Sequence, residues 1–262
     1  MVVWILALNN IKRVFGNFVM IPILILMPVF QMVIMNIIME SVAPASNGSA
    51  AADPFIEVVV LGNTVNLPMI QLFTASTMVQ FLLISGIIAA IMIVAQREDK
   101  TLMRIFSCPV RHSSIVIGNL LGVSMVILIV AMILLGITSL LLGIDWGSSW
   151  VNVVIVTVFV IYAAASMGFL FSAIFSSAKL AGPIMSFVVI AMTFFSDSFT
   201  FSGQMDATAR FTLNKWAYSA YNELMEGRNL DAVYGNLLIL GLSGTVLLII
   251  AILLYRRERI YE

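Results

Sequence analysis

The sequence has little charge, one cysteine and one histidine, and each shortage excludes a class of protein. Only 10% of the 262 residues are charged and the formal net charge is +0, so nothing indicates a nucleic-acid partner. The lone Cys108 excludes an internal disulfide, and the lone His112 excludes a metal site of the His-x-x-x-His type. No Gly-x-x-x-x-Gly-Lys-Ser/Thr phosphate loop occurs either, so the chain cannot bind ATP in that manner. We expect no catalytic residue and no metal.

Apolar residues are what the chain has in excess. They make up 61% of the sequence, whereas an ordinary soluble domain is about half apolar and about a quarter charged. One soluble core of this size could not bury so much apolar surface. The bilayer must therefore serve as the solvent, and the sequence predicts an integral membrane protein.

Six apolar runs are candidates for membrane-crossing helices, each of which needs about 20 residues. They lie at about 18–39, 70–95, 115–142, 151–175, 180–195 and 236–255. The predicted fold is an all-α integral membrane protein, with residues 1–262 forming one transmembrane domain of six helices.

The basic residues predict the orientation of these helices. Ten of the 13 Lys and Arg residues fall before the first run, after the second, after the fourth or after the last. Because cytoplasmic segments carry the excess of Lys and Arg, both termini are predicted to be cytoplasmic. We expect a multi-pass protein of the cell membrane, the plasma membrane of a bacterium.

Two segments outside the runs also have interpretable patterns. Residues 1–15 predict an amphipathic helix in the headgroup plane, although a plain cytoplasmic extension of the first span fits equally well. In the first outer loop, the alternating apolar residues of 55–68 and the Gly62-Asn63 pair predict a β-hairpin.

The predicted spans contain no ionisable side chain in their central parts. Carriers coupled to protons or ions usually place such side chains at mid-membrane, so this absence argues against them. Any energy for transport must then come from outside the chain.

Two segments outside the membrane carry the most informative patterns. QREDKTLMRIFSCPVRHSS, which begins at Gln96, is a basic cytoplasmic loop with an apolar stripe of Leu102, Ile105 and Phe106 at helical spacing. A helix of this kind could enter a groove on a partner or rest on the headgroups. FTLNKWAYSAYNELMEG, after the fifth span, places Trp216 and Tyr221 on a wide apolar and aromatic helix face suited to the outer membrane interface.

Both segments resemble those of the membrane subunits of type-two ATP-binding-cassette exporters. In the first, Lys100 replaces the usual Gly, and the matching residues are Arg97, Glu98, Thr101, Leu102 and Pro109. In the second, Leu213 and Lys215 replace Pro and Gly, and the matching residues are Thr212, Asn214, Trp216 and Ala217.

The resemblance implies a permease that exports its substrate with a separate ATPase subunit, which would hold the ATP and Mg. A cytoplasmic coupling helix would contact that ATPase through Arg97, Glu98, Lys100, Thr101, Leu102, Ile105 and Phe106. Short outer helices carrying Trp216 and Tyr221 would lie between the fifth and sixth spans.

The resemblance also implies a dimer with a second copy or a paralogue, which encloses a path between the first, second and fifth spans. The candidate path residues are Gln31, Met35, Gln80, Thr193, Phe194 and Phe195. These apolar and Met-rich walls suit a hydrophobic or amphiphilic substrate, such as a drug, a lipid-like molecule or a peptide. The alternatives are a non-transporting sensor or assembly subunit, and a channel that works alone.

Overall fold

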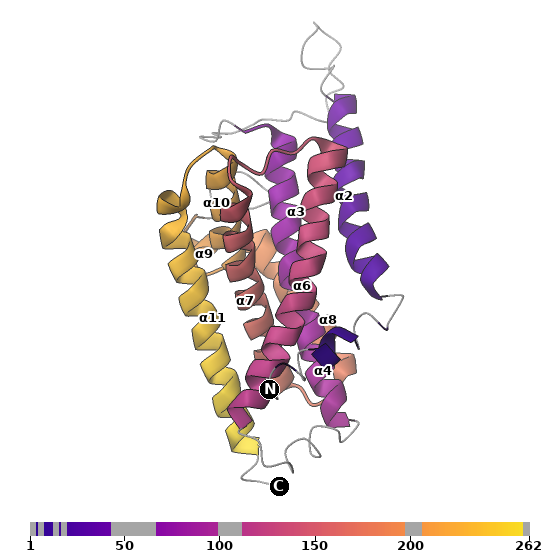
Figure 1. Ribbon diagram of the computed structural model, residues 1–262, viewed down its shortest axis with the longest axis vertical. Coiled ribbons are helices and arrows are strands. Elements are labelled where there is room, and N and C mark those ends of the chain that lie inside the picture. Colours follow the sequence, from indigo (N-terminus) through magenta and orange to yellow (C-terminus); the bar gives the residue numbers. More distant parts are fainter. Residues whose placement is uncertain are drawn as a thin grey trace, which may run out of the picture.

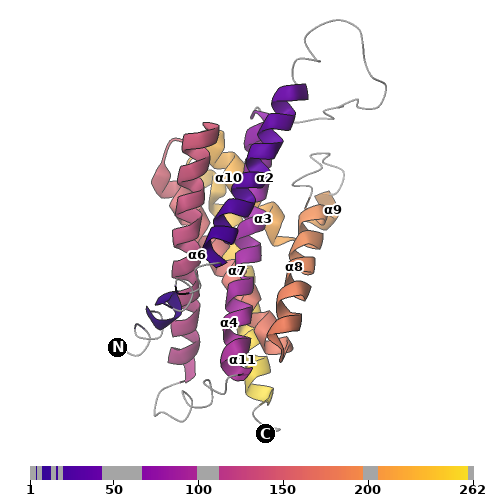
Figure 2. The same cartoon turned by 90° about the vertical axis from the view of Figure 1, so that its right-hand side faces the viewer.

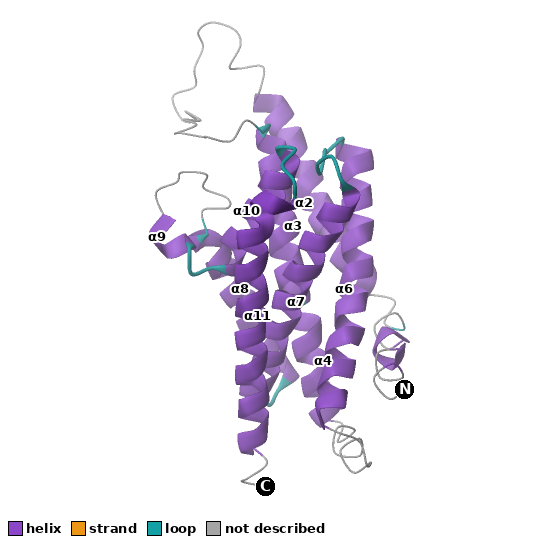
Figure 3. Ribbon diagram, turned by 60° about the vertical axis from the view of Figure 1, so that its left-hand side comes forward, coloured by secondary structure: helices purple, strands orange, loops and turns teal. Residues whose placement is uncertain are grey.

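The computed structural model describes residues 4, 8–12, 16, 20–42, 67–98, 112–196 and 206–258, and the regular elements of these residues are all helices (Figures 1 and 3). In chain order they are α2 (Met20–Val42), α3 (Met69–Ser85), α4 (Ile87–Glu98), α6 (His112–Leu142), α7 (Trp150–Ile174), α8 (Ala178–Phe195), α9 (Asp206–Ala209), α10 (Leu213–Met225) and α11 (Leu230–Glu258). The all-helical class predicted from the sequence is confirmed for these residues.

Five helical stretches of the described chain are long and apolar enough to cross a membrane. They are Met69–Glu98, Gly118–Leu142, Trp150–Ile174, Ala178–Phe195 and Leu230–Tyr255. Their positions agree with the second to sixth predicted spans. The first predicted span coincides with α2, but the described apolar stretch of α2, Leu24–Ile38, is shorter than a full crossing. Six crossings therefore stay a prediction.

The second predicted span consists of two helices, α3 and α4, which meet at Gly86. This glycine touches α7: a Cβ added at Gly86 would lie 2.3 Å from the carbonyl oxygen of Ala164. Likewise, a Cβ added at Gly168 would lie 2.2 Å from the carbonyl oxygen of Gly86. Small residues let two membrane helices approach until their backbones touch. The α3–α4 span therefore packs against α7 in backbone contact near the middle of the bundle.

Helix α7 lies at the centre of the bundle and contacts α3, α4, α6, α8, α10 and α11. Figure 1 shows it between α11 and α6. Most of its side chains are buried, including the consecutive alanines Ala163, Ala164 and Ala165. The other spans are therefore positioned relative to one another largely through α7.

Helix α10 packs into the bundle, against α11, α3 and α7. Tyr221 has no exposed surface, and its ring meets Trp146 edge-on with centroids 5.7 Å apart. Its hydroxyl lies 2.7 Å from the Thr157 Oγ1 and is the donor, since Thr157 already donates to the Val153 carbonyl. Tyr221 is therefore buried in the bundle and does not lie at the membrane interface as predicted. The reason is that neighbouring helices cover its ring and Thr157 accepts the hydrogen bond of its hydroxyl. Trp216 is half-buried.

Other predicted features lie outside the described residues. These include the coupling helix beyond Glu98 and nearly all of the 55–68 hairpin. Of the N-terminal helix predicted over 1–15, positions 4 and 8–12 are helical.

Candidate functional site

Three consecutive polar side chains end α4, at the lower end of the bundle in Figure 1. They are Gln96, Arg97 and Glu98, which we call the α4 junction. Successive side chains of an α-helix point about 100° apart, so these three face in different directions. Each of them contacts a different part of the chain.

Gln96 belongs to a closed ring of three buried side-chain amides. Asn10 Nδ2 donates to Asn119 Oδ1 (2.8 Å), Asn119 Nδ2 donates to Gln96 Oε1 (3.4 Å), and Gln96 Nε2 donates to Asn10 Oδ1 (3.5 Å). A buried amide without a partner is costly, whereas here each amide both donates and accepts. The ring joins α4 to α6 and to the N-terminal segment.

Arg97 joins α4 to α11 and, through it, to α7. Its guanidinium carbon lies 4.5 Å from the centroid of the Tyr255 ring, a cation–π arrangement. The Tyr255 hydroxyl lies 2.7 Å from the Ser172 Oγ. Because the Ser172 hydroxyl already donates to the Phe169 carbonyl, Tyr255 is the donor of this bond. One side chain of the junction thereby reaches two further spans.

Glu98 joins α4 to the start of α8. Its Oε1 accepts a hydrogen bond from the backbone N–H of Ala178, the first residue of α8, at 3.2 Å. Ser177, in the N-cap position, makes no side-chain cap bond. A carboxylate near a helix N-terminus satisfies a free N–H group and opposes the positive end of the helix dipole.

The structure describes two of the seven predicted coupling residues. Arg97 and Glu98 lie at the junction, while Lys100, Thr101, Leu102, Ile105 and Phe106 lie outside the described residues. The sequence did not predict that Asn10, Asn119 and Tyr255 are partners of the junction. A single amide near the start of a long apolar run, as at Asn119, was the available signal, because such a group needs a partner.

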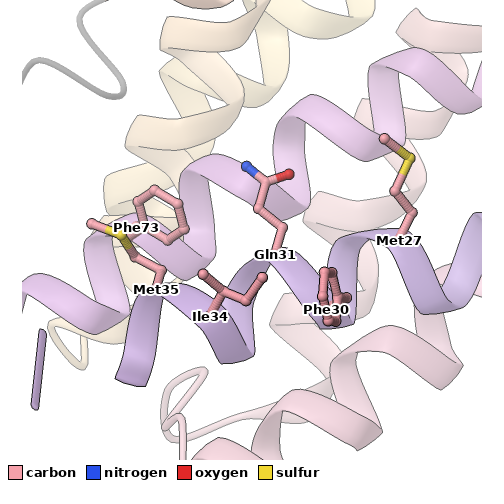
Figure 4. A pocket seen from close by; sticks show the side chains of 6 residues that line it. All are labelled: Met27, Phe30, Gln31, Ile34, Met35 and Phe73. Carbon is pink, nitrogen blue, oxygen red and sulfur yellow. The ribbon is translucent and has the colours of Figure 1, made fainter. Parts of the chain in front are cut away.

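The predicted path residues do not form one cluster. Gln31 and Met35 line a groove of about 310 Å³ where α2 meets α3, which Figure 4 shows from close by. The other lining residues are Met27, Phe30, Ile34 and Phe73. Gln31 is the polar member of this set, so the groove is an apolar surface with one amide.

The remaining path candidates, Gln80, Thr193, Phe194 and Phe195, lie outside this groove. Thr193 is buried and accepts a hydrogen bond from the Asn214 side-chain amide of α10. Phe194 and Phe195 are 65% and 53% exposed. The side-chain oxygen of Gln80 is buried and has no hydrogen-bond partner among the described residues.

Residues 56–253 match the family model described as ABC-2 family transporter protein. The chain belongs to the ABC-2 transporter family. The matched range includes the α4 junction, α8 and α10, whereas α2 and Asn10 precede it. A comparison with curated proteins gives no match.

Membership in the ABC-2 family makes this chain the permease component of an ABC transporter and a multi-pass membrane protein. Such a permease has no catalytic site of its own, and the family implies an ABC-type ATPase as its partner. Among the described residues, no group of three or more His, Cys, Asp or Glu side chains is placed to hold a metal ion.

Proposed function

We propose that this ABC-2 permease exports a hydrophobic or amphiphilic substrate as one half of a dimer. A separate ABC ATPase binds the ATP and Mg, and the permease chain itself binds no cofactor. The partner half is a second copy or a paralogue. Residues 1–262 act as one transmembrane domain.

The α4 junction is the observation that carries this proposal. Residues 99–111 connect Glu98, the last residue of α4, to His112, the first residue of α6. A displacement of that segment therefore acts on the three contacts of Gln96, Arg97 and Glu98, which reach α6, α11 and α8. In the proposed mechanism the coupling residues from Arg97 to Phe106 contact the ATPase, and the junction distributes their movement.

The apolar groove on α2 supports the proposed substrate class. Its side chains suit a drug, a lipid-like molecule or a peptide with an apolar surface, and the Gln31 amide offers one hydrogen-bonding group. Phe30 is 68% exposed, and α8 presents Phe194 and Phe195 in the same way. A second permease half would supply the opposite wall of a path bounded by these helices.

The orientation in this proposal follows the basic residues. The lower end of the bundle, which holds the α4 junction, faces the cytoplasm together with both termini. The membrane is the plasma membrane of a bacterium, and the direction of transport is outward.

The test is purification of the chain from its host in mild detergent, with mass spectrometry of the proteins that accompany it. We expect a stoichiometric partner that contains a phosphate-binding loop, and we expect Glu98→Arg to remove it. Glu226→Arg, which reverses the charge of the residue directly after α10 and breaks its ion pair with Arg228, is the matched control and should retain the partner. Liposomes that contain the purified complex should then export a fluorescent amphiphile only with ATP. Recovery of the chain alone would favour a sensor subunit, and ATP-independent movement of the amphiphile would favour a channel.

A further inference from the structure

Helix α8 is held to the rest of the chain over a small part of its surface. Only 28% of its apolar window is buried, against 72% for the α3–α4 span. Leu180 and Phe187 are 56% and 72% exposed. Figure 2 shows α8 with α9 at one side of the bundle. The few contacts that α8 does make therefore decide its position.

Polar contacts lie near the two ends of α8. At the upper end, Thr193 accepts a hydrogen bond from the Asn214 amide of α10. At the lower end, the Ala178 N–H donates to Glu98 of α4. Between them, α8 packs on α4 through Gly182, where an added Cβ would lie 3.3 Å from Ile91 Cδ1.

The bond at the lower end replaces a cap that the chain could have made locally. Ser177 has the extended backbone of an N-cap residue (φ −117°, ψ 127°), and serine is a favoured N-cap, yet its hydroxyl makes no cap bond. Lys179 places a positive charge in the first turn of α8, which is unfavourable at the positive end of the helix dipole. The carboxylate that offsets the positive dipole end and the Lys179 charge belongs to Glu98 of α4.

We propose that Glu98 is a positioning residue that ties α8 to α4. A movement of the lower end of α4 then reaches α8 directly at its first residue, without passing through α7. This inference rests on the proposed function for its meaning in transport, but the bond itself is open to test in the permease alone. A cap supplied by Ser177 would stabilise α8 equally well and transmit nothing from α4.

The experiment compares four variants: Glu98→Gln, Glu98→Ala, Ser177→Asp, and Glu98→Ala combined with Ser177→Asp. Hydrogen exchange of the first turn of α8 is measured by mass spectrometry in the permease alone. The same measurement is made on the permease–ATPase complex, with and without ATP and vanadate. Glu226→Ala, which removes a carboxylate that pairs with Arg228 after α10, is the control and should behave as wild type in the exchange of α8.

In the permease alone, we expect Glu98→Ala to accelerate exchange in the first turn of α8 and Ser177→Asp to reverse that effect. In the complex, ATP and vanadate should change exchange in α8 of the wild type and of Glu98→Gln, whose amide oxygen still accepts the bond. The response should be lost in Glu98→Ala and should stay lost when Ser177→Asp is added. A cap from residue 177 would thus restore the protection of the first turn of α8 but not its response to ATP.

Two results would overturn the proposal. One is recovery of the ATP response by Ser177→Asp, which would make Glu98 a cap and nothing more. The other is unchanged exchange of α8 in the Glu98→Ala permease, which would show that the carboxylate does not hold α8. If the wild-type chain has no ATPase partner, the proposed function fails, while exchange in the permease alone still decides whether Glu98 holds α8.

Discussion

Within the ring, Asn10, Gln96 and Asn119 each use one donor and one acceptor, so their orientations depend on one another. Rotating any one amide by 180° would place two donors or two acceptors face to face at both of its bonds. The ring therefore specifies the packing of three segments as well as stabilising it. Among apolar helices, such a ring selects one arrangement from many that would bury a similar area.

The first prediction concerns this ring. Asn10→Leu keeps the number and branching of the side-chain heavy atoms but removes the donor to Asn119 Oδ1 and the acceptor from Gln96 Nε2. We expect it to lower the free energy of unfolding in detergent by about 1–3 kcal/mol, the usual cost of unsatisfied buried polar groups. Asn9→Leu changes the exposed neighbour and should stay within about 0.5 kcal/mol of wild type. Equal effects of the two substitutions would contradict a structural role for the ring.

The second prediction concerns Glu223, on α10 and outside the membrane-length helices. Burial raises the pKa of this carboxyl above its ordinary value of 4.5, and the positive charge of Arg228 opposes the shift. The folded state then binds the proton more tightly than the unfolded state, so ionisation of Glu223 at neutral pH reduces stability. Glu223→Gln removes this effect.

Thermal unfolding in detergent across pH 4.5 to 8 would test this. We expect Glu223→Gln to unfold at a higher temperature than wild type at neutral pH. The difference should shrink as the pH falls through the raised pKa towards 4.5, because the wild-type carboxyl becomes protonated first in the folded state and then, below 4.5, in both states. A difference that grows as the pH falls would show the opposite sign of the shift.

At the scale of elements, the α3–α4 span crosses α7 in direct backbone contact. Gly86 and Gly168 bring two backbones together without intervening side chains. In a membrane, packing between helices has no large hydrophobic gain to draw on, so close van der Waals contact matters more. The crossing therefore fixes where α4, and hence the junction at its end, lies along α7.

The third prediction follows from this crossing. Gly168→Ala would place a methyl group 2.2 Å from the Gly86 carbonyl oxygen and push the helices apart, at a cost of about 1–3 kcal/mol. Gly136→Ala on α6 is the matched control, since an added Cβ there meets nothing within 4 Å. It should be neutral, or stabilising by about 0.5–1 kcal/mol through helix propensity. Chemical unfolding in detergent compares the two.

The helices differ in how well the sequence predicts them. The spans are predictable because long apolar runs leave few alternatives to a helix, and α7 and α8 begin within two residues of their predicted starts. The burial of Tyr221 is not predictable from α10 alone, because an aromatic helix face fits a membrane interface and a bundle equally well. The buried position of Tyr221 depends on contacts with Trp146 and Thr157, which are distant in sequence.

The junction illustrates the same limit. The motif that includes Arg97 and Glu98 predicted a functional segment, but periodicity could not name Asn10, Tyr255 or Ala178 as its partners. Those contacts arise when four separate stretches of the chain meet at one end of the bundle. A pattern within one segment carries no information about such meetings.

At the scale of the whole molecule, the spans differ in how much of each is buried inside the bundle. The α3–α4 and α7 windows are 72% and 67% buried, whereas those of α8 and α11 are 28% and 22% buried. The well-buried spans form the centre of the bundle, and the others expose broad apolar faces, which in the proposed dimer meet lipid or the second permease half. This division suits a protein in which some helices move relative to others.

The fourth prediction tests the orientation of the whole bundle. In a Cys108→Ser background, Ser148→Cys and Ser176→Cys place one exposed thiol each in the turns before and after α7. A membrane-impermeant maleimide added to intact cells should label Ser148→Cys, and should label Ser176→Cys only after the cells are opened. The reverse pattern would place the α4 junction outside the cell and remove the basis for its contact with an ATPase.

The junction also constrains the length of α4 more strictly than its composition. A single residue inserted after Ile91 would turn everything below it by about 100° and advance it by about 1.5 Å. Gln96, Arg97 and Glu98 would then lose the amide ring, the Tyr255 ring and the start of α8 together. Exchange of one apolar side chain for another in α4 leaves that geometry in place. Insertions and deletions in this helix should therefore be far less tolerated than substitutions.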